Sequence, residues 1–202
     1  DDDFTVEKYG VSNSLDVLRN DFDPNGDPIS INGGTTTFQM VHPLATRRLQ
    51  VFTNSFPIAE HLLKHSKNTI MVPGGVIYRE QNIVLSPFDN DVTRNFYARR
   101  MFMGAHGLAP IGLMEADPLL IQAEEKLLDQ ADELVVLVDS SKFDNRSSLV
   151  LCPLEKIDIV ITDEGISDRA ASMLEAADVR VIVEKAMAIA ETLCIYTNER
   201  LT

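Results

Sequence analysis

From Ile29 onward the chain alternates short, β-branched apolar runs with stretches that place apolar residues at helical spacing. The first kind of pattern is typical of strands and the second of amphipathic helices. Strands are expected at residues 29–31, 49–54, 69–72, 76–78, 82–85, 134–138, 157–161 and 179–183. Helices are expected to begin near residues 35, 55, 92, 118 and 167, and the apolar segment at 101–104 leads into a loop that reaches residue 117.

Strands that alternate with helices favour a parallel sheet. The unbroken apolar run Leu134–Val138 predicts a central strand that is buried on both faces. We therefore expect one α/β domain over residues 29–185, an open, mostly parallel sheet with helices on both faces. Residues 1–28 form an acidic leader, and residues 186–202 form a C-terminal tail with a helical pattern. On the helix over 118–128, the polar side is expected to hold Glu124, Glu125 and Lys126, followed by Asp129.

The first expected strand ends at a Gly-Gly pair that opens a helix. The residues are Asn32, Gly33, Gly34, Thr35, Thr36 and Thr37. Glycines let backbone N–H groups approach a ligand, and the first turn of a helix offers unpaired N–H donors and a partial positive charge. The next two strands also end in small or polar residues, Thr53-Asn54-Ser55 and Gly74-Gly75. Ligands of open α/β sheets bind where strands end, so these segments predict an anion site. The alternative is an ordinary turn followed by a helix cap.

Composition and charge narrow the class of protein. The net charge is −13, which argues against nucleic-acid binding through a general electrostatic field. No apolar run reaches the length of a membrane span, and no signal peptide opens the chain, so we expect a cytoplasmic protein without a membrane partner. The two cysteines, Cys152 and Cys194, share no motif spacing, and Cys152 is expected to be a buried thiol.

The acidic leader differs in kind from the rest of the chain. Residues 1–28 carry a net charge of −6, and the other 174 residues carry −7. The run from Arg19 to Pro28 resembles the start of a cadherin-like or Ig-like repeat of bacterial surface adhesins. That resemblance makes Asp21, Asp23 and Asp27 weak candidates for calcium ligands, since Ca²⁺ prefers carboxylate oxygens. The alternative is an acidic, turn-rich leader that is not a complete domain, and no other metal site is expected.

The body of the chain resembles the C-terminal effector domain of DeoR/GlpR-type bacterial transcriptional regulators. Seven motifs in order carry this resemblance between Ile29 and Val183. They are Ile-Asn-Gly-Gly-Thr-Thr-Thr, Thr-Asn-Ser, Pro-Gly-Gly, Gly-Ala-x-Gly-Leu, Gly-Leu with Asp-Pro, Val-Asp-Ser-Ser-Lys-Phe and Ile-Thr-Asp. The resemblance implies a NagB/RpiA/CoA-transferase-like fold, related to ribose-5-phosphate isomerase and glucosamine-6-phosphate deaminase.

The resemblance also implies a function and a set of contacts. Such a domain is a repressor's sensor for a phosphorylated sugar intermediate of carbohydrate catabolism; it does not turn the ligand over, needs no cofactor and forms a homo-oligomer. The phosphate would be bound by Asn32, Gly33, Gly34, Thr35, Thr36, Thr37, Thr53, Asn54 and Ser55. The sugar would face Gly74, Gly75, Gly104, Ala105, His106, Gly107, Asp117, Asp139 and Lys142. Lys142 supplies the cation expected near a phosphate or sugar oxyanion.

One departure from the family pattern and two alternative functions follow from the same residues. The family places a winged helix-turn-helix before this domain, but the acidic leader occupies that position, so we expect no DNA binding by this chain alone. Three origins would explain the leader at this position: a truncated sensor, a fusion or a recombined reading frame. The first alternative function is a sugar-phosphate isomerase, which needs a general base. The Gly104–Gly107 loop has no acid, which argues against an isomerase, although Glu115, Asp117 and Asp139 lie nearby in sequence. The second is a calcium-binding surface module.

Overall fold

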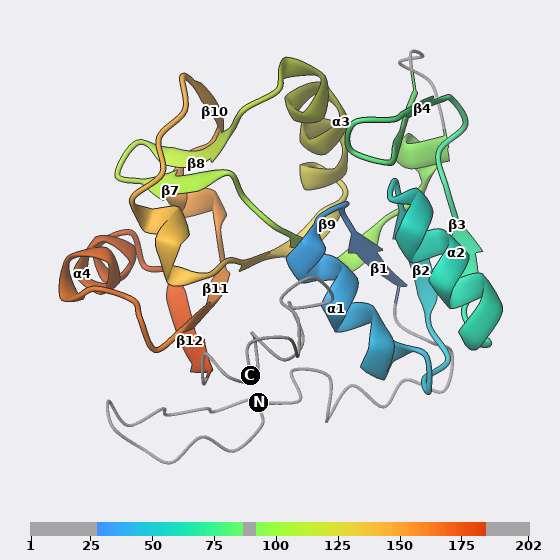
Figure 1. Ribbon diagram of the computed structural model, residues 1–202, viewed down its shortest axis with the longest axis horizontal. Helices are drawn as coiled ribbons and strands as arrows, with labels where there is room; N and C mark the ends of the chain where they lie inside the picture. The colour runs from blue at the N-terminus through green and yellow to red at the C-terminus, as the bar shows by residue number, and fades with distance from the viewer. Residues whose placement is uncertain (1–27, 87–91, 185–202) are drawn as a thin grey trace, which may run out of the picture.

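The computed structural model describes residues 28–86 and 92–184 (Figure 1). Two parts of the prediction lie outside these residues: the acidic leader with its calcium candidates Asp21, Asp23 and Asp27, and the C-terminal tail with Cys194. Within the described residues, no helix has the length and apolar character needed to cross a membrane.

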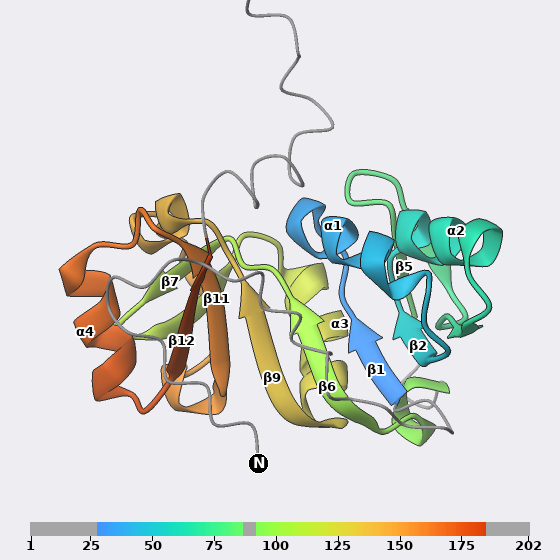
Figure 2. The ribbon, with the colours of Figure 1, turned by 90° about the horizontal axis from the view of Figure 1, so that it is seen from below.

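Seven parallel strands form the main sheet, in the order β12-β11-β9-β6-β1-β2-β3 (Figure 2). Their bounds are β1 Pro28–Ile31, β2 Gln50–Thr53, β3 Thr69–Met71, β6 Ala98–Met103, β9 Ala131–Leu137, β11 Ile159–Asp163 and β12 Arg180–Glu184. The expected α/β class and parallel sheet are confirmed. In the expected buried run Leu134–Val138, all residues but the half-buried Leu137 have exposed fractions of 5% or less.

The helices begin where the sequence supplies caps. The Ser55 side chain accepts a hydrogen bond from the Ile58 N–H at the start of α2 (Phe56–His65), and Ser167 caps α4 (Asp168–Ala176) in the same way. Asp117 caps α3 (Pro118–Leu128), which has proline in its first turn. The remaining helix, α1 (Thr35–Leu44), follows Gly34, which has no side chain with which to cap it.

Alternate residues of each strand point to opposite faces of the main sheet, and each face carries its own apolar cluster. Helices α1 and α2 cover one face, where Ile31, Val51 and Phe102 pack with Val41 and Leu62; helices α3 and α4 lie on the other. That second face buries Phe52, Met101, Met103, Leu134, Val136, Val160 and Leu174. Helices therefore cover both faces, as expected, with α2 and α4 toward opposite ends of the sheet (Figure 2).

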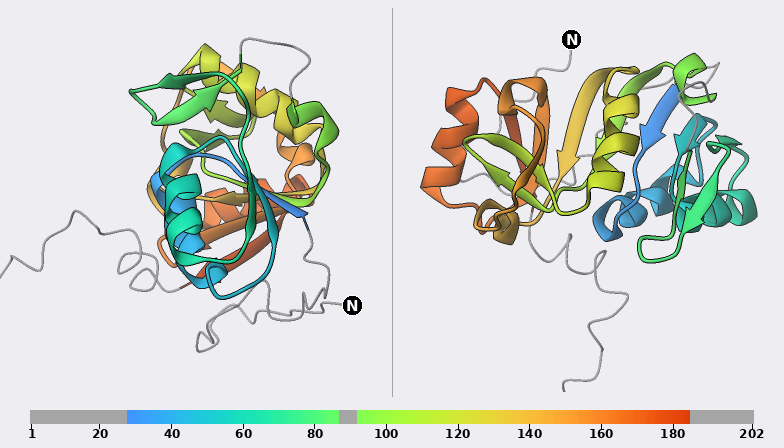
Figure 3. Two further views of the ribbon diagram at one scale, coloured as in Figure 1. Left: turned by 90° about the vertical axis from the view of Figure 1, so that its right-hand side faces the viewer. Right: turned by 90° about the horizontal axis from the view of Figure 1, so that it is seen from above.

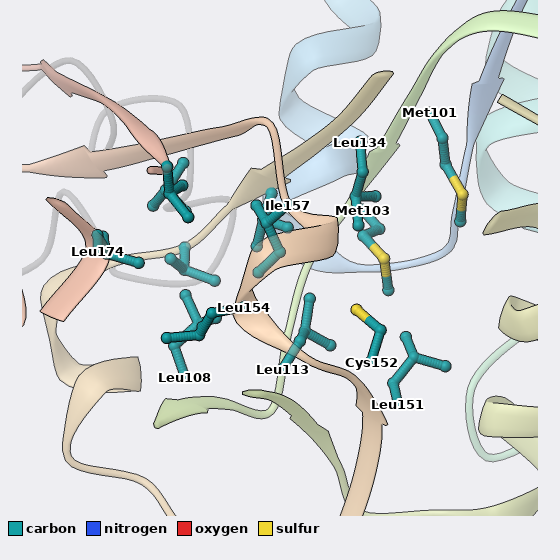
Figure 4. Packing of buried hydrophobic residues seen from close by; sticks show 14 of the residues in the cluster. Met101, Met103, Leu108, Leu113, Leu134, Leu151, Cys152, Leu154, Ile157 and Leu174 are labelled. Atoms are coloured by element: carbon teal, nitrogen blue, oxygen red, sulfur yellow. The ribbon is translucent and has the colours of Figure 1, made fainter. Parts of the chain in front are cut away.

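A three-stranded antiparallel sheet lies on the α3 face, and the sequence pattern did not predict it. Its strands are β7 Gly107–Ala109, β8 Gly112–Glu115 and β10 Leu149–Cys152. Their side chains Leu108, Leu113 and Cys152 belong to the same buried cluster as Met101 and Met103 of the main sheet (Figure 4). The expected loop up to residue 117 is thus wrong for β7 and β8, because glycines begin both strands and hide their apolar alternation. Cys152 is a buried free thiol, as expected.

A two-stranded hairpin completes the described fold. It consists of β4 Val76–Tyr78 and β5 Ile83–Leu85, which match the expected strands. The hairpin lies beside α3 (Figures 1 and 3), and the Tyr78 hydroxyl donates a 2.9 Å hydrogen bond to Asp117 Oδ2 at the start of that helix. Short 3-10 helices occupy Val92–Asn95 (η1), Ser140–Phe143 (η2) and Leu154–Lys156 (η3).

Candidate functional site

The strand order of the main sheet reverses between β1 and β6. From β1 the chain proceeds to β2 and β3 on one side, and from β6 it proceeds to β9, β11 and β12 on the other. The segments that leave these two strands start together, since the Asn32 N–H donates to the Phe102 carbonyl at 2.8 Å. Ligands of open α/β sheets bind at such a reversal, so the residues that follow β1 and β6 are the candidate site.

The segment after β1, residues 32–37, is called the glycine loop below. It leads directly into α1, whose first-turn N–H groups have no intrahelical acceptor. Gly34 and Thr35 are exposed and Thr36 is half-buried, so the start of this helix is open to solvent. An added Cβ at Gly33 would lie 2.7 Å from Ile83 Cγ2 of the hairpin. Glycine at 33 therefore lets the loop lie close against the hairpin.

Three of the predicted hydroxyl groups face inward. The Thr37 hydroxyl is buried and lies 2.8 Å from the Asn32 carbonyl, to which it donates, and the buried Thr53 hydroxyl donates to the Ile31 carbonyl at 2.6 Å. Ser55 is buried as the cap of α2. These three side chains fix the glycine loop and its neighbour strand, while Gly34, Thr35 and Thr36 present the accessible donors.

Two further side chains hold the glycine loop. Asn54 Oδ1 accepts a 3.1 Å hydrogen bond from the Gly33 N–H, and the Asn32 Nδ2 group donates to Glu124 Oε1 of α3 at 2.5 Å. Asn54 and Glu124 are 2% and 4% exposed, respectively. Their other polar atoms, Asn54 Nδ2 and Glu124 Oε2, have no hydrogen-bond partner among the described residues. The loop thus rests on two buried side chains that each keep one polar atom unused.

The prediction that Glu124 lies on the polar side of α3 is wrong, because its side chain is buried. Its neighbour Glu125 is exposed as predicted, but Glu124 lies between Ile121 and Leu127, which both pack against the core. Burial, with a smaller contribution from the nearby Glu115 carboxylate, raises the pKa of Glu124 to about 8. A carboxyl group at the glycine loop is therefore mostly protonated near neutral pH.

The loop after β6, residues 104–107, is held by Glu115 of β8. The buried Glu115 carboxylate accepts hydrogen bonds from the His106 N–H and the Ala116 N–H, both at 3.2 Å. Burial raises the pKa of Glu115, and these hydrogen bonds oppose the rise. Gly104, Ala105 and His106 are half-buried, and the His106 carbonyl accepts from Asn145 Nδ2 at 3.2 Å. The sequence pattern did not mark Glu115 as a support of this loop.

The remaining predicted sugar-facing residues divide into caps and loop positions. Asp117 caps α3, and Asp139 caps η2 by accepting from the Ser141 N–H at 2.9 Å. Lys142 lies in η2, half-buried, and its ammonium has no ion-pair partner within residues 28–86 and 92–184. Gly74 and Gly75 follow the edge strand β3 and lead into the hairpin, two strands away from β1.

A cavity of about 190 Å³ lies beside this site, between the end of β2, the hairpin and α3. Asn54 lies in its wall together with apolar side chains such as Phe52 and Val84, and with Gln122 and Lys126 of α3. In the part of the chain that the structure describes, no group of three His, Cys, Asp or Glu side chains is arranged to hold a metal ion.

Comparison with known proteins agrees with this arrangement. The family model of the DeoR C terminal sensor domain matches residues 21–164. The transcriptional regulator UlaR of Escherichia coli (strain SMS-3-5) is 31% identical over 177 residues, covering 87% of this chain and 68% of that regulator. UlaR of Shigella dysenteriae serotype 1 is 32% identical over the same length.

Among solved structures, ribose 5-phosphate isomerase A of Methanocaldococcus jannaschii is similar at 18% identity and a TM-score of 0.41. The similar region covers 61% of this chain and spans about half (49%) of the isomerase. The family model and the regulators are the findings that assign the family. The chain belongs to the family of DeoR-type transcriptional regulators, as their C-terminal sensor domain.

Proposed function

We propose that this sensor domain binds a phosphorylated sugar at the reversal between β1 and β6, with the phosphate on the glycine loop. The observation that carries the proposal is the start of α1. Gly34 leaves that helix without a side-chain cap, whereas Ser55, Asp117 and Ser167 cap the other three α-helices. Free N–H groups and the helix dipole favour an anion at that position. The side chains of Thr35 and Thr36 add hydroxyl donors.

The other predicted residues have distinct roles in this proposal. Asn32, Gly33, Thr37, Thr53, Asn54 and Ser55 keep the glycine loop in shape, and Gly34, Thr35 and Thr36 contact the phosphate. Lys142 and residues 104–107 border this site from the β6 and β9 side, where they contact the sugar. Asp117 and Asp139 act mainly as helix caps, and the hairpin that contains Gly75 borders the site.

We infer that the ligand is bound and not converted. Isomerisation needs a general base within reach of a substrate C–H group, and residues 104–107 offer no acid. The Glu124 carboxyl is the candidate for a general base at the site, because its pKa of about 8 is near the range that suits a base. Prolonged incubation with ribose 5-phosphate and glucose 6-phosphate, followed by NMR, should return both compounds unchanged. Conversion of either would overturn this inference.

The test of binding compares sugar phosphates with the matching free sugars. At a concentration 100 times its Kd, a bound ligand raises the free energy of unfolding by about 2.7 kcal/mol. Sugar phosphates that bind should therefore raise the melting temperature by several degrees, and ribose and glucose should not. Equal shifts from phosphorylated and free sugars would contradict the proposal.

Thr35→Asp is a variant matched to this claim. Thr35 is exposed at the start of α1, where a carboxylate is favourable for the helix but repels a bound phosphate. The variant should remain folded and lose sugar-phosphate binding. Thr46→Asp, which makes the same charge change at an exposed position after the other end of α1, should keep it.

We also propose that this chain alone binds no operator DNA, that it associates as a homo-oligomer, and that residues 29–185 are the unit that binds the ligand. The net charge of −13 supports the first point. A sequence-specific mobility shift at sub-micromolar concentration would contradict it. Light scattering tests the oligomer, and ligand binding by a fragment without residues 1–20 tests the unit.

A further inference from the structure

The Glu124 carboxyl supports the glycine loop with one oxygen and buries the other oxygen without a partner among the described residues. Its Oε1 atom accepts the hydrogen bond from Asn32 Nδ2, but its Oε2 atom is buried without a partner among the described residues. Buried polar atoms in native proteins are nearly always hydrogen-bonded, because leaving one unpaired costs free energy. The unpaired oxygen therefore points to a partner outside the described residues.

The position of Glu124 indicates where that partner lies. Through Asn32 the carboxyl is one hydrogen bond away from the glycine loop. On the other side is Glu115, which holds the loop after β6 through the His106 N–H and whose charge contributes to the raised pKa of Glu124. Glu124 thus lies between the two loops that diverge at the strand-order reversal, beside the place proposed for the phosphate.

We propose that Glu124 is a specificity-determining residue whose Oε2 atom hydrogen-bonds a hydroxyl group of the ligand, so that the domain selects phosphorylated polyols over other phosphate esters. This rests on the function proposed above. A second phosphate is unsuited to the position, because the neighbouring Glu115 carboxylate repels an anion. A hydroxyl both donates and accepts, so it pairs with this carboxyl in either protonation state.

The test uses Glu124→Gln with Glu125→Gln as its matched control. Glutamine keeps an oxygen for Asn32 and replaces the second carboxyl oxygen by NH₂, while Glu125 is the exposed neighbour on the same helix. Calorimetry gives the Kd of each protein for inorganic phosphate, ribose 5-phosphate, ribitol 5-phosphate and n-pentyl phosphate. The last compound has the chain length of ribitol 5-phosphate without its hydroxyl groups.

For the wild type, we expect the better of the two polyhydroxy ligands to bind roughly tenfold more tightly than n-pentyl phosphate, which is the effect of leaving one buried polar atom without its hydrogen-bond partner. In Glu124→Gln that preference should fall about tenfold while the affinity for inorganic phosphate stays within about twofold. Glu125→Gln should match the wild type.

Three results would overturn the inference. The first is a wild type whose affinity for n-pentyl phosphate equals its affinity for the polyhydroxy ligands. This result is decisive even if Glu124→Gln does not fold, because it is measured on the wild type alone. An equal loss for inorganic phosphate and the polyhydroxy ligands in Glu124→Gln would show that Glu124 acts only by supporting Asn32, and no change would show that it has no role. If the wild type binds no phosphate compound at all, the proposed function itself fails.

Discussion

Replacing Glu124 by glutamine should change how the stability of the domain depends on pH. Burial is the main cause that raises the pKa of this carboxyl from its ordinary value of 4.5 to about 8 in the folded protein. Folding therefore favours the protonated form. Its contribution to stability is fully present below pH 4.5, falls as the pH rises toward 8, and is lost above the folded pKa.

The size of the effect follows from the two pKa values. Each pH unit between them corresponds to about 1.4 kcal/mol, so ionisation of Glu124 costs the folded state up to about 5 kcal/mol at pH 9. Glutamine cannot ionise and keeps an oxygen for the Asn32 amide. The variant should therefore equal the wild type near pH 4 and be more stable than it by a few kcal/mol at pH 9.

Urea unfolding followed by circular dichroism at several pH values between 4 and 9 measures this difference directly. Glu125→Gln is the control, since an exposed carboxyl should give a difference from the wild type that stays flat with pH. A flat difference for Glu124→Gln as well would refute the reasoning, because it would show that the Glu124 carboxyl is not destabilised by burial in the folded protein.

Three other substitutions or probes test the packing. Gly75→Ala would place a Cβ 2.0 Å from the Leu85 carbonyl oxygen and should cost about 1–3 kcal/mol of stability, whereas Gly74→Ala meets nothing within 4 Å and should cost little in unfolding experiments. Leu174→Ala, at a fully buried position, should lower the free energy of unfolding by about 2–5 kcal/mol; a smaller loss would mean that α4 packs loosely. In a Cys194→Ser background, Cys152 should react with a thiol reagent only on unfolding, because burial raises its pKa to about 11; rapid reaction of the native protein would contradict this.

Much of the fold could be predicted because its signals are local. Helix α3 begins at Pro118 and ends at Leu128, as the sequence pattern indicates. The strands β1, β2 and β9 follow their β-branched apolar runs. Strand β6, at the centre of the sheet, was less evident, because it contains two arginines and one of them, Arg100, is buried in an ion pair with Glu133 at 2.6 Å.

The site was harder to predict than the fold, because it depends on which side chains tertiary packing brings to the glycine loop. Glu124 looks polar in the sequence, yet it is spaced three residues after Ile121 and three before Leu127, and this spacing was the available signal for an inward position. Thr37 and Thr53 look like ligand donors, but their hydroxyls bond backbone carbonyls of β1 and its following loop. Hydroxyl residues next to glycines do not reveal by sequence alone which of them face solvent.

The central claim, that a phosphate group binds at the start of α1, can be tested most directly by NMR. Inorganic phosphate and a sugar phosphate would be titrated into ¹⁵N-labelled protein, and the backbone amide signals followed. We predict that the largest shifts occur at the N–H groups of Gly34, Thr35 and Thr36, with both ligands and at the same residues. Shifts confined to other parts of the chain, with these amides unchanged at saturation, would contradict the account.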